Sequence, residues 1–365
     1  MYLYIGLMIF IVISGIVFDY CRLNRKIYLV LTMGILCFLT ACRAYIIGND
    51  TLNYINIFDK MKAISFSEVY RSGMRYERGY LYFNKLISFI SQNNQIILII
   101  TSIIIWVSLG IFIYRYSENN WLSLYLIIVM GFLTLPMNII RQGLAIGITL
   151  YSYKYILNRN PIKFVLCVLI AMMFHHTAII FIIAYPISKI KFNWKTVIII
   201  ISLTVIIYLT FSKFLDIFLS IFPIYEGYIG GKYFSGGVRL ASVINTLIII
   251  ITLILGSILN FYKSSKFKSE QVCIKENTLA MFILIALSIS IISFKFNLLD
   301  RISDYFNIFA IIYLPNAISQ YKNRKYAFLI TSIVLILFGL YFIIIQLYRP
   351  EWNSIYPYHF FWEFN

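Results

Sequence analysis

Long apolar stretches alternate with polar gaps along the chain of 365 residues. A helix that crosses a membrane needs about 20 mostly apolar residues. The pattern predicts spans at about 2–18, 27–45, 95–114, 121–136, 139–157, 162–187, 196–212, 241–261, 279–294, 302–319 and 326–347. We therefore expect an all-α integral membrane protein: a polytopic helical bundle of about 11–12 transmembrane segments, forming a single membrane domain over residues 1–365.

Lysine and arginine gather in several of the gaps, which predicts that these gaps are cytoplasmic and that the N-terminus lies outside. The basic gaps contain Arg22, Arg25 and Lys26; Arg115; Lys154, Arg159 and Lys163; Lys263, Lys266, Lys268 and Lys275; and Lys322, Arg324 and Lys325. The basic gap at 189–195 joins them only if 162–187 is broken or re-entrant and reverses near His175 and His176. Such a break is allowed where the backbone lines a protein-walled cavity. The alternative is a single crossing with a few misplaced lysines.

This orientation places the long polar gaps at about 46–94 and 213–240 outside the membrane. The first gap predicts an amphipathic helix over about 76–92, lying on the membrane surface. Its apolar positions are Tyr76, Tyr80, Phe83, Ile87 and Ile90, and its other faces carry Arg78, Asn84, Lys85 and Ser88.

The composition supports this topology, since 61% of the residues are hydrophobic and only 12% are charged, against about 25% charged in soluble domains. The net charge of +17 would suit nucleic acid, but basic residues clustered between spans are the ordinary topology signal. We expect no nucleic-acid partner. The five cysteines lack metal-ligand spacing and are expected to be buried hydrophobes. The sequence also lacks nucleotide-binding glycine motifs and metal clusters, so we expect no cofactor and no metal.

Two charged sites lie within apolar segments. Arg141 and His175 are roughly 20 Å and 18 Å along the helix from the nearest predicted cytoplasmic lysines. An ionised group at mid-bilayer costs about 2.5 to 3.5 kcal/mol on insertion scales and usually marks a functional site. Arg43, Arg239 and Arg301 lie near the outer edge of the predicted core, where a single arginine also reaches the headgroups by snorkelling. Together they predict an outward-facing band of cations.

Arginines at this depth suit a polyanionic headgroup with a lipid tail, because guanidinium binds phosphate oxygens bidentately and stays charged. Acidic residues are predicted on the same side. Asp50 directly follows the second span, and Glu77 precedes the amphipathic helix, where it either caps that helix or reaches the site.

Short motifs along the chain resemble those of the EpsG-type family of bacterial polysaccharide polymerases, which includes O-antigen polymerases of the Wzy kind. The matching pieces are Gly48-x-Asp50-Thr-x-x-Tyr54 with Phe58; Glu77-x-Gly79-Tyr80; Arg141-Gln142-x-x-Ala145; Phe174-His175 followed by Thr177-Ala178; Arg301-x-x-x-Tyr305; and Pro315. Thr177 stands where the family more often has serine, and His176 occupies a variable position. The stretch 213–240, with Tyr225, Glu226 and Arg239, matches poorly.

The resemblance implies a metal-independent glycosyltransferase in the bacterial cytoplasmic (inner) membrane, with its active site facing the periplasm or outside. It would act in O-antigen, lipopolysaccharide or exopolysaccharide biosynthesis, moving the growing glycan from undecaprenyl diphosphate onto a new lipid-linked repeat unit. The fold would be GT-C-like by analogy. Membrane lipids, a chain-length regulator and a flippase of the same pathway are the further partners implied.

The resemblance also implies roles for particular residues. The diphosphate would be bound by Arg141, Gln142, Arg301, Arg43 and Arg239. The general base for the acceptor hydroxyl stays open among His175, Asp50 and Glu77.

Three alternatives remain. An O-antigen ligase would move finished chains to another lipid acceptor. A flippase or other transporter for lipid-linked oligosaccharides needs charge reachable from both sides, usually in two repeated halves, and no such repeat is evident. A membrane acyltransferase also uses an intramembrane histidine, but that residue would face the cytoplasm.

Overall fold

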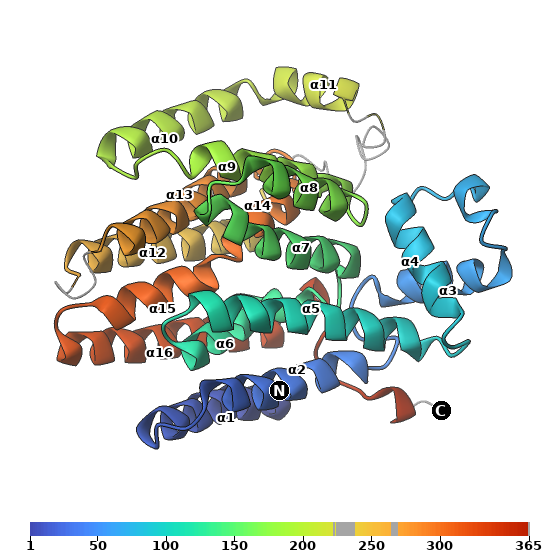
Figure 1. Cartoon of the computed structure of the whole chain (residues 1–365), viewed down its shortest axis with the longest axis horizontal. Helices are drawn as coiled ribbons and strands as arrows, with labels where there is room; N and C mark the ends of the chain where they lie inside the picture. The colour runs from blue at the N-terminus through green and yellow to red at the C-terminus, as the bar shows by residue number, and fades with distance from the viewer. Residues whose placement is uncertain (222, 224–237, 264–268, 364–365) are drawn as a thin grey trace. The chain divides into compact units, whose positions relative to one another are not determined.

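The computed structural model describes residues 1–221, 223, 238–263 and 269–363. Every regular element in these ranges is helical (Figure 1), which confirms the all-α class. Contacts divide the chain into two compact units, residues 1–179 with 324–365 and residues 180–323, and each is described separately. Most of the expected external segment 213–240, with Tyr225 and Glu226, lies outside the described residues, as do Lys266 and Lys268. The single membrane domain stays a prediction.

The first unit contains nine α-helices and four short 3₁₀ turns in these ranges. The helices are α1 (Tyr2–Tyr20), α2 (Arg25–Ala41), α3 (Thr51–Ala63), α4 (Arg78–Ser88), α5 (Gln95–Tyr116), α6 (Asn120–Val129), α7 (Ile140–Leu157), α8 (Pro161–Met172) and α16 (Arg324–Tyr348). The turns are η1 (Val69–Arg71), η2 (Phe132–Thr134), η6 (Pro350–Trp352) and η7 (Phe361–Glu363). A longer 3₁₀ segment, η3 (His176–Ile183), begins in this unit and continues into the second.

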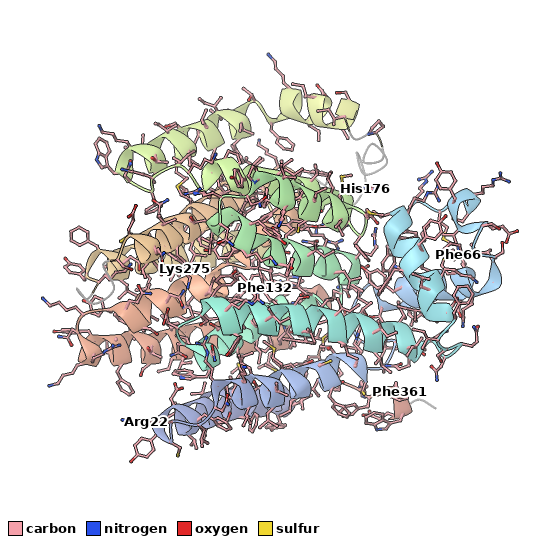
Figure 2. All side chains as sticks on the ribbon, viewed as in Figure 1. Arg22, Phe66, Phe132, His176, Lys275 and Phe361 are labelled. Carbon is pink, nitrogen blue, oxygen red and sulfur yellow. The ribbon has the colours of Figure 1, made fainter. Side chains whose placement is uncertain are left out.

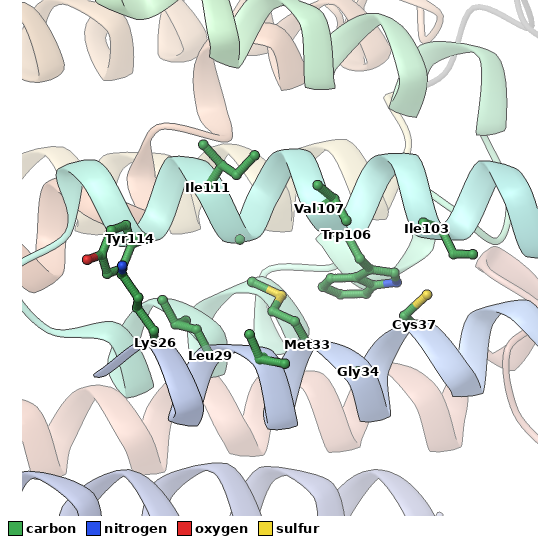
Figure 3. A pocket seen from close by; sticks show the side chains of 12 residues that line it. Lys26, Leu29, Met33, Gly34, Cys37, Ile103, Trp106, Val107, Ile111 and Tyr114 are labelled. Carbon is green, nitrogen blue, oxygen red and sulfur yellow. The ribbon is translucent and has the colours of Figure 1, made fainter. Parts of the chain in front are cut away.

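Four helices of the first unit pack in succession, α8 on α7, α7 on α5 and α5 on α2 (Figure 1). Between α2 and α5 runs a groove of about 430 Å³ that is apolar except at one end, where Lys26 lies near Tyr114 (Figure 3). Helices α3 and α4 pack against each other at one end of α5. The segment that leads into α3 is fixed by the C-terminal tail, because the N–H groups of Ala44 and Gly48 donate to carbonyls of His359 and Ser354.

The second unit contains seven α-helices in the described ranges. They are α9 (Ala184–Ile187), α10 (Trp194–Leu209), α11 (Phe211–Ile221), α12 (Leu240–Phe261), α13 (Glu270–Ile292), α14 (Leu299–Asn307) and α15 (Ala310–Gln320). Helix α9 is a single turn that continues η3. Helix α15 packs on α12 and α13. Helix α13 also contacts α10, α12 and α14 and so forms the centre of this unit.

Five helices in the described ranges are long and apolar enough to cross a membrane: α1, α5, α12, α13 and α16. The pair α10 and α11, bent by 81°, raises the number to six if it is counted as one span. These helices confirm a polytopic helical membrane protein. Other predicted spans form shorter helices. In 121–136, for example, α6 ends at Val129 because Gly131 adopts a left-handed conformation that closes the helix.

The predicted break in 162–187 is present. Helix α8 ends at Met172, and η3 begins at His176. In a continuous helix the N–H of His176 would bond to the carbonyl of Met172, but it donates to Glu77 instead. The carbonyl of Met173 likewise accepts the N–H of Tyr80, at 3.2 Å. The helix therefore stops because its backbone groups bond to the segment around α4.

Two expectations about burial are wrong. Asn84, Lys85 and Ser88, which we expected on the other faces of the amphipathic helix, are buried, whereas Ile90 is 70% exposed. The polar residues are held by local contacts, such as the bond from the Asn84 side chain to the carbonyl of Tyr80, because this side of the helix packs against protein. The five cysteines are free thiols as expected, but none is fully buried.

Candidate active site

Glu77 lies at the centre of the charged cluster in the first unit. It precedes α4 with an extended backbone, and its side chain makes no capping bond to the helix. The carboxylate is 4% exposed. It turns away from α4 and binds groups from two other segments. Of the two roles expected for Glu77, the structure therefore favours reaching the site over capping the helix.

Arg141 and His175 meet at this carboxylate. Nη1 of Arg141, in the first turn of α7, forms an ion pair with Oε2 of Glu77. Nδ1 of His175, just beyond α8, lies 3.0 Å from Oε1, and that oxygen also accepts the backbone N–H of His176 at 3.1 Å. Figure 2 shows His176 at this end of α8. The two groups that the sequence placed at similar depths thus share one acid.

The charge of Glu77 follows from these contacts. Burial raises the pKa of the carboxyl group, but the hydrogen bond with His175 and the positive charge of Arg141 outweigh it. The pKa falls from 4.5 to about 2. Glu77 is therefore a carboxylate at neutral pH and a weak proton acceptor.

Gly79 allows α4 to approach the break after α8. A Cβ atom at this position would lie 2.6 Å from the carbonyl oxygen of Met173 and 2.7 Å from its Cβ. No side chain fits without a shift of one backbone against the other. The glycine of the Glu77-x-Gly79-Tyr80 motif is thus explained by the close contact that also brings Glu77 to His175.

Three other predicted site residues belong to the first unit: Gln142, Asp50 and Arg43. Gln142 is buried in α7, next to Arg141. Asp50 precedes α3 and is half-buried. Arg43 is fully buried, and its guanidinium donates to the carbonyls of Thr40 and, at 3.3 Å, Met137. These contacts tie α2 to the segment before α7.

Arg239 and Arg301 belong to the second unit, where both side chains are exposed. The carboxylate of Asp300 accepts hydrogen bonds from Ser242 and, at 2.6 Å, from Ser293. Arg239 lies near enough to interact electrostatically with Asp300. The predicted roles of Arg239 and Arg301 in binding diphosphate stay predictions.

The sequence pattern assigned no chemical role to Tyr76. Its ring lies against the guanidinium of Arg141, with 4.9 Å from Cζ to the ring centroid, a distance typical of a cation–π contact. The only signal in the sequence is its position directly before Glu77. Tyr76 also lines a polar pocket between α3 and the segment before α4.

An apolar cavity of about 240 Å³ lies between α5 and α7. Phe83 of α4 and Phe174, the residue before His175, also line it, and their rings pack edge to face at 5.8 Å. Tyr76, which contacts Arg141, thus lines a polar pocket, and Phe174, which precedes His175, lines an apolar cavity. Among the described residues, no group of three or more His, Cys, Asp or Glu side chains is arranged to hold a metal ion.

Comparisons with known proteins identify the family of the chain. Neither a curated protein nor a solved structure matches the chain. The model of the EpsG family matches residues 26–360, nearly the whole chain. The chain therefore belongs to the EpsG family and is a membrane protein of the polysaccharide-polymerase type.

Proposed function

We propose that this protein polymerises polysaccharide at the outer face of the cytoplasmic membrane, moving the growing glycan from undecaprenyl diphosphate onto a new lipid-linked repeat unit. The anomeric carbon of the growing chain would lose its bond to the diphosphate oxygen and gain one to a hydroxyl of the acceptor. The observation that carries this proposal is the cluster of Glu77, Arg141 and His175, with a polar pocket and an apolar cavity beside it.

Arg141 suits the leaving group. As the glycosidic bond breaks, the electron pair passes to the diphosphate, and a fixed cation stabilises this growing charge. One terminal nitrogen of Arg141 binds Glu77, which orients the guanidinium and leaves the second terminal nitrogen to bind a phosphate oxygen. The side chain is 21% exposed, so an incoming anion has access to it.

His175 suits the general base. A neutral imidazole that donates Nδ1–H to Glu77 carries its lone pair on Nε2, which would take the proton of the acceptor hydroxyl. Glu77 acts as a positioning residue in this scheme, because its low pKa makes it a weak base while its charge favours the protonated ring that forms. The other ring nitrogen is thus the group that we assign to proton transfer.

The apolar cavity suits the lipid portion of the substrate. Aliphatic and aromatic side chains from α4, α5 and α7 line it, and the only polar atoms among its lining side chains are the hydroxyls of Ser108 and Tyr151. A polyprenyl chain whose diphosphate lies at Arg141 could place its first isoprene units there. Burial of apolar surface would contribute about 25 cal/mol per Å² to binding.

The test uses the purified full-length chain in detergent with undecaprenyl-diphosphate-linked repeat units. We expect a ladder of lengthened lipid-linked glycans and release of undecaprenyl diphosphate as the ladder grows. Transfer only to a different lipid acceptor would identify a ligase, and unchanged substrate would contradict the proposal.

A deletion strain provides the matching test in cells. Loss of a polymerase leaves single repeat units on the surface, whereas loss of a ligase leaves none. Complementation with the native gene restores long chains if the proposal is correct.

A further inference from the structure

The polar pocket beside Tyr76 carries features that the proposed chemistry does not use. Its cavity volume is about 450 Å³, within the range of about 300–1,000 Å³ for small-ligand sites. Two segments form it: one side of α3 and the loop before α4. The lining residues are Asn53, Asn56, Ile57, Lys60, Ser72, Gly73, Met74, Arg75 and Tyr76.

The pocket is positively charged. Lys60 and Arg75 line it, and no acid is among the lining residues. Neither of these two cations forms an ion pair within the described part of the chain. The neighbouring acids on these segments are engaged, since Asp59 pairs with Lys62 at 2.6 Å and Glu77 pairs with Arg141. The charge in the pocket is therefore left for an anionic ligand.

The pocket also offers hydrogen-bonding groups. Asn53, Asn56 and Lys60 recur at helical spacing, so they share one face of α3. The hydroxyl oxygen of Ser72 is buried without a hydrogen-bond partner in the described structure. A buried hydroxyl of this kind usually has a partner, and a ligand hydroxyl in the pocket would supply one.

Tyr76 joins the pocket to the charged cluster. Its side chain lines the pocket, and its ring lies against Arg141. A ligand that fills the pocket therefore lies next to the group to which we assign the leaving diphosphate. This adjacency matches a glycan whose reducing end is at Arg141.

We propose that this pocket binds a sugar residue of the substrate glycan, and that it selects a sugar carrying a carboxylate. The amides and the Ser72 hydroxyl would bind sugar hydroxyls, and Lys60 and Arg75 would bind the carboxylate. This inference rests on the proposed function in one respect, that the ligand is a glycan. It adds the substrate class, an acidic repeat unit, and the residues that select it.

Binding to short glycans tests the proposal without catalysis. The probes are a tetrasaccharide that alternates glucuronic acid with N-acetylglucosamine and the neutral tetrasaccharide of N-acetylglucosamine, each titrated into the full-length chain in detergent. We expect the acidic glycan to bind about tenfold more tightly, as charge-assisted hydrogen bonds allow. The double variant Lys60→Gln with Arg75→Gln should remove this preference.

The matched control is Arg71→Gln, which removes an exposed arginine of the same segment outside the pocket. It should leave the preference unchanged, and thermal unfolding should show that all variants are folded. Equal affinity for both glycans, or a preference that survives in the double variant, would overturn the proposal. So would inorganic phosphate binding as tightly as the acidic glycan.

The two proposals fail separately. If the protein prefers the acidic glycan but never lengthens lipid-linked units, the proposed glycan pocket stands and the proposed polymerase function is wrong. If the protein polymerises lipid-linked units but binds both probes equally, the proposed polymerase function stands and the proposed selectivity for an acidic sugar is wrong.

Discussion

Glu77 in the first unit and Asp300 in the second are both shielded acids with an arginine nearby, yet their surroundings have opposite effects. Glu77 binds Arg141 and His175 directly, and its pKa falls to about 2. Asp300 is held mainly by the hydroxyls of Ser242 and Ser293. Burial raises the pKa of Asp300, because these bonds and the charge of Arg239 compensate only in part. Direct contact with a cation, rather than burial alone, decides which acid stays charged.

The largest expected effect tests whether Arg141, the cation paired with Glu77, stabilises the leaving diphosphate. Arg141→Ala should abolish long chains, with a loss of roughly 100- to 1,000-fold, as expected when a fixed donor to a developing oxyanion is removed. Arg141→Lys keeps the charge and should rescue poorly, because lysine lacks the bidentate geometry. Gel analysis of surface polysaccharide in a complemented deletion strain provides the measurement. Normal polymer ladders from both variants would contradict the assignment.

The sequence pattern makes the same prediction for the second unit. Arg301→Ala should also abolish long chains while the protein remains inserted in the membrane. The side chain is exposed, so its removal should leave the fold intact. Normal polymer from this variant would show that Arg301 is not needed and that the required residues are those of the cluster around Glu77.

The adjacent histidines provide a matched pair. His175→Ala removes the ring that Glu77 orients and should lower polymer synthesis by roughly 100-fold or more, as expected for a general base. His176→Ala should stay within about threefold, because His176 reaches Glu77 through its backbone N–H. The rate of lipid-linked chain growth with purified protein measures both. Equal losses from the two variants would contradict the assignment of the base.

The two acids should differ in their effect on stability. Glu77→Gln should lower the free energy of unfolding by about 3 kcal/mol, because it leaves the partly buried Arg141 without its counter-charge. Asp300→Asn should cost little or even stabilise the protein at neutral pH, because its ionised form is disfavoured in the fold. Thermal unfolding of the full chain in detergent measures both changes. A larger loss from Asp300→Asn would reverse the comparison.

The pH dependence follows from the same pKa directions. The folded-state pKa of Glu77 is below 4.5, so its stabilisation is complete above that pH and is lost as the pH falls toward 2. The raised pKa of Asp300 has the opposite sign, and its cost in stability grows as the pH rises from 3.8 to the raised value. Native protein should therefore lose more stability between about pH 5 and pH 3 than the Glu77→Gln variant does. Parallel curves would exclude the charged state assigned to Glu77.

The smallest expected effect comes from two glycines, Gly79 and Gly256, at which another segment packs closely against the helix. Gly79→Ala should destabilise the protein by about 1 to 3 kcal/mol and lower polymer synthesis as well, because it separates α4 from Met173. Gly256→Ala in the second unit meets the ring of Tyr313, with a Cβ distance of 2.3 Å, and should affect stability without changing the rate of the folded protein. A rate loss from Gly256→Ala alone would show that the site depends on that helix contact.

The sequence by itself determined the class of protein and much of the site. Apolar runs require helices in a membrane, because the backbone must satisfy its own hydrogen bonds there. The cost of burying charge singled out Arg141 and His175, and the basic gaps indicated the break near His175. Membership of the EpsG family agrees with the motifs.

Only the tertiary structure decided how these groups are used. Glu77 is separated by 64 residues from Arg141 and by 98 from His175, and no local rule relates such distant positions. The buried polar side of α4 and the full burial of Arg43 depend likewise on packing partners from other segments. Periodicity identifies the faces of a helix, but the protein that packs against each face determines which one is buried.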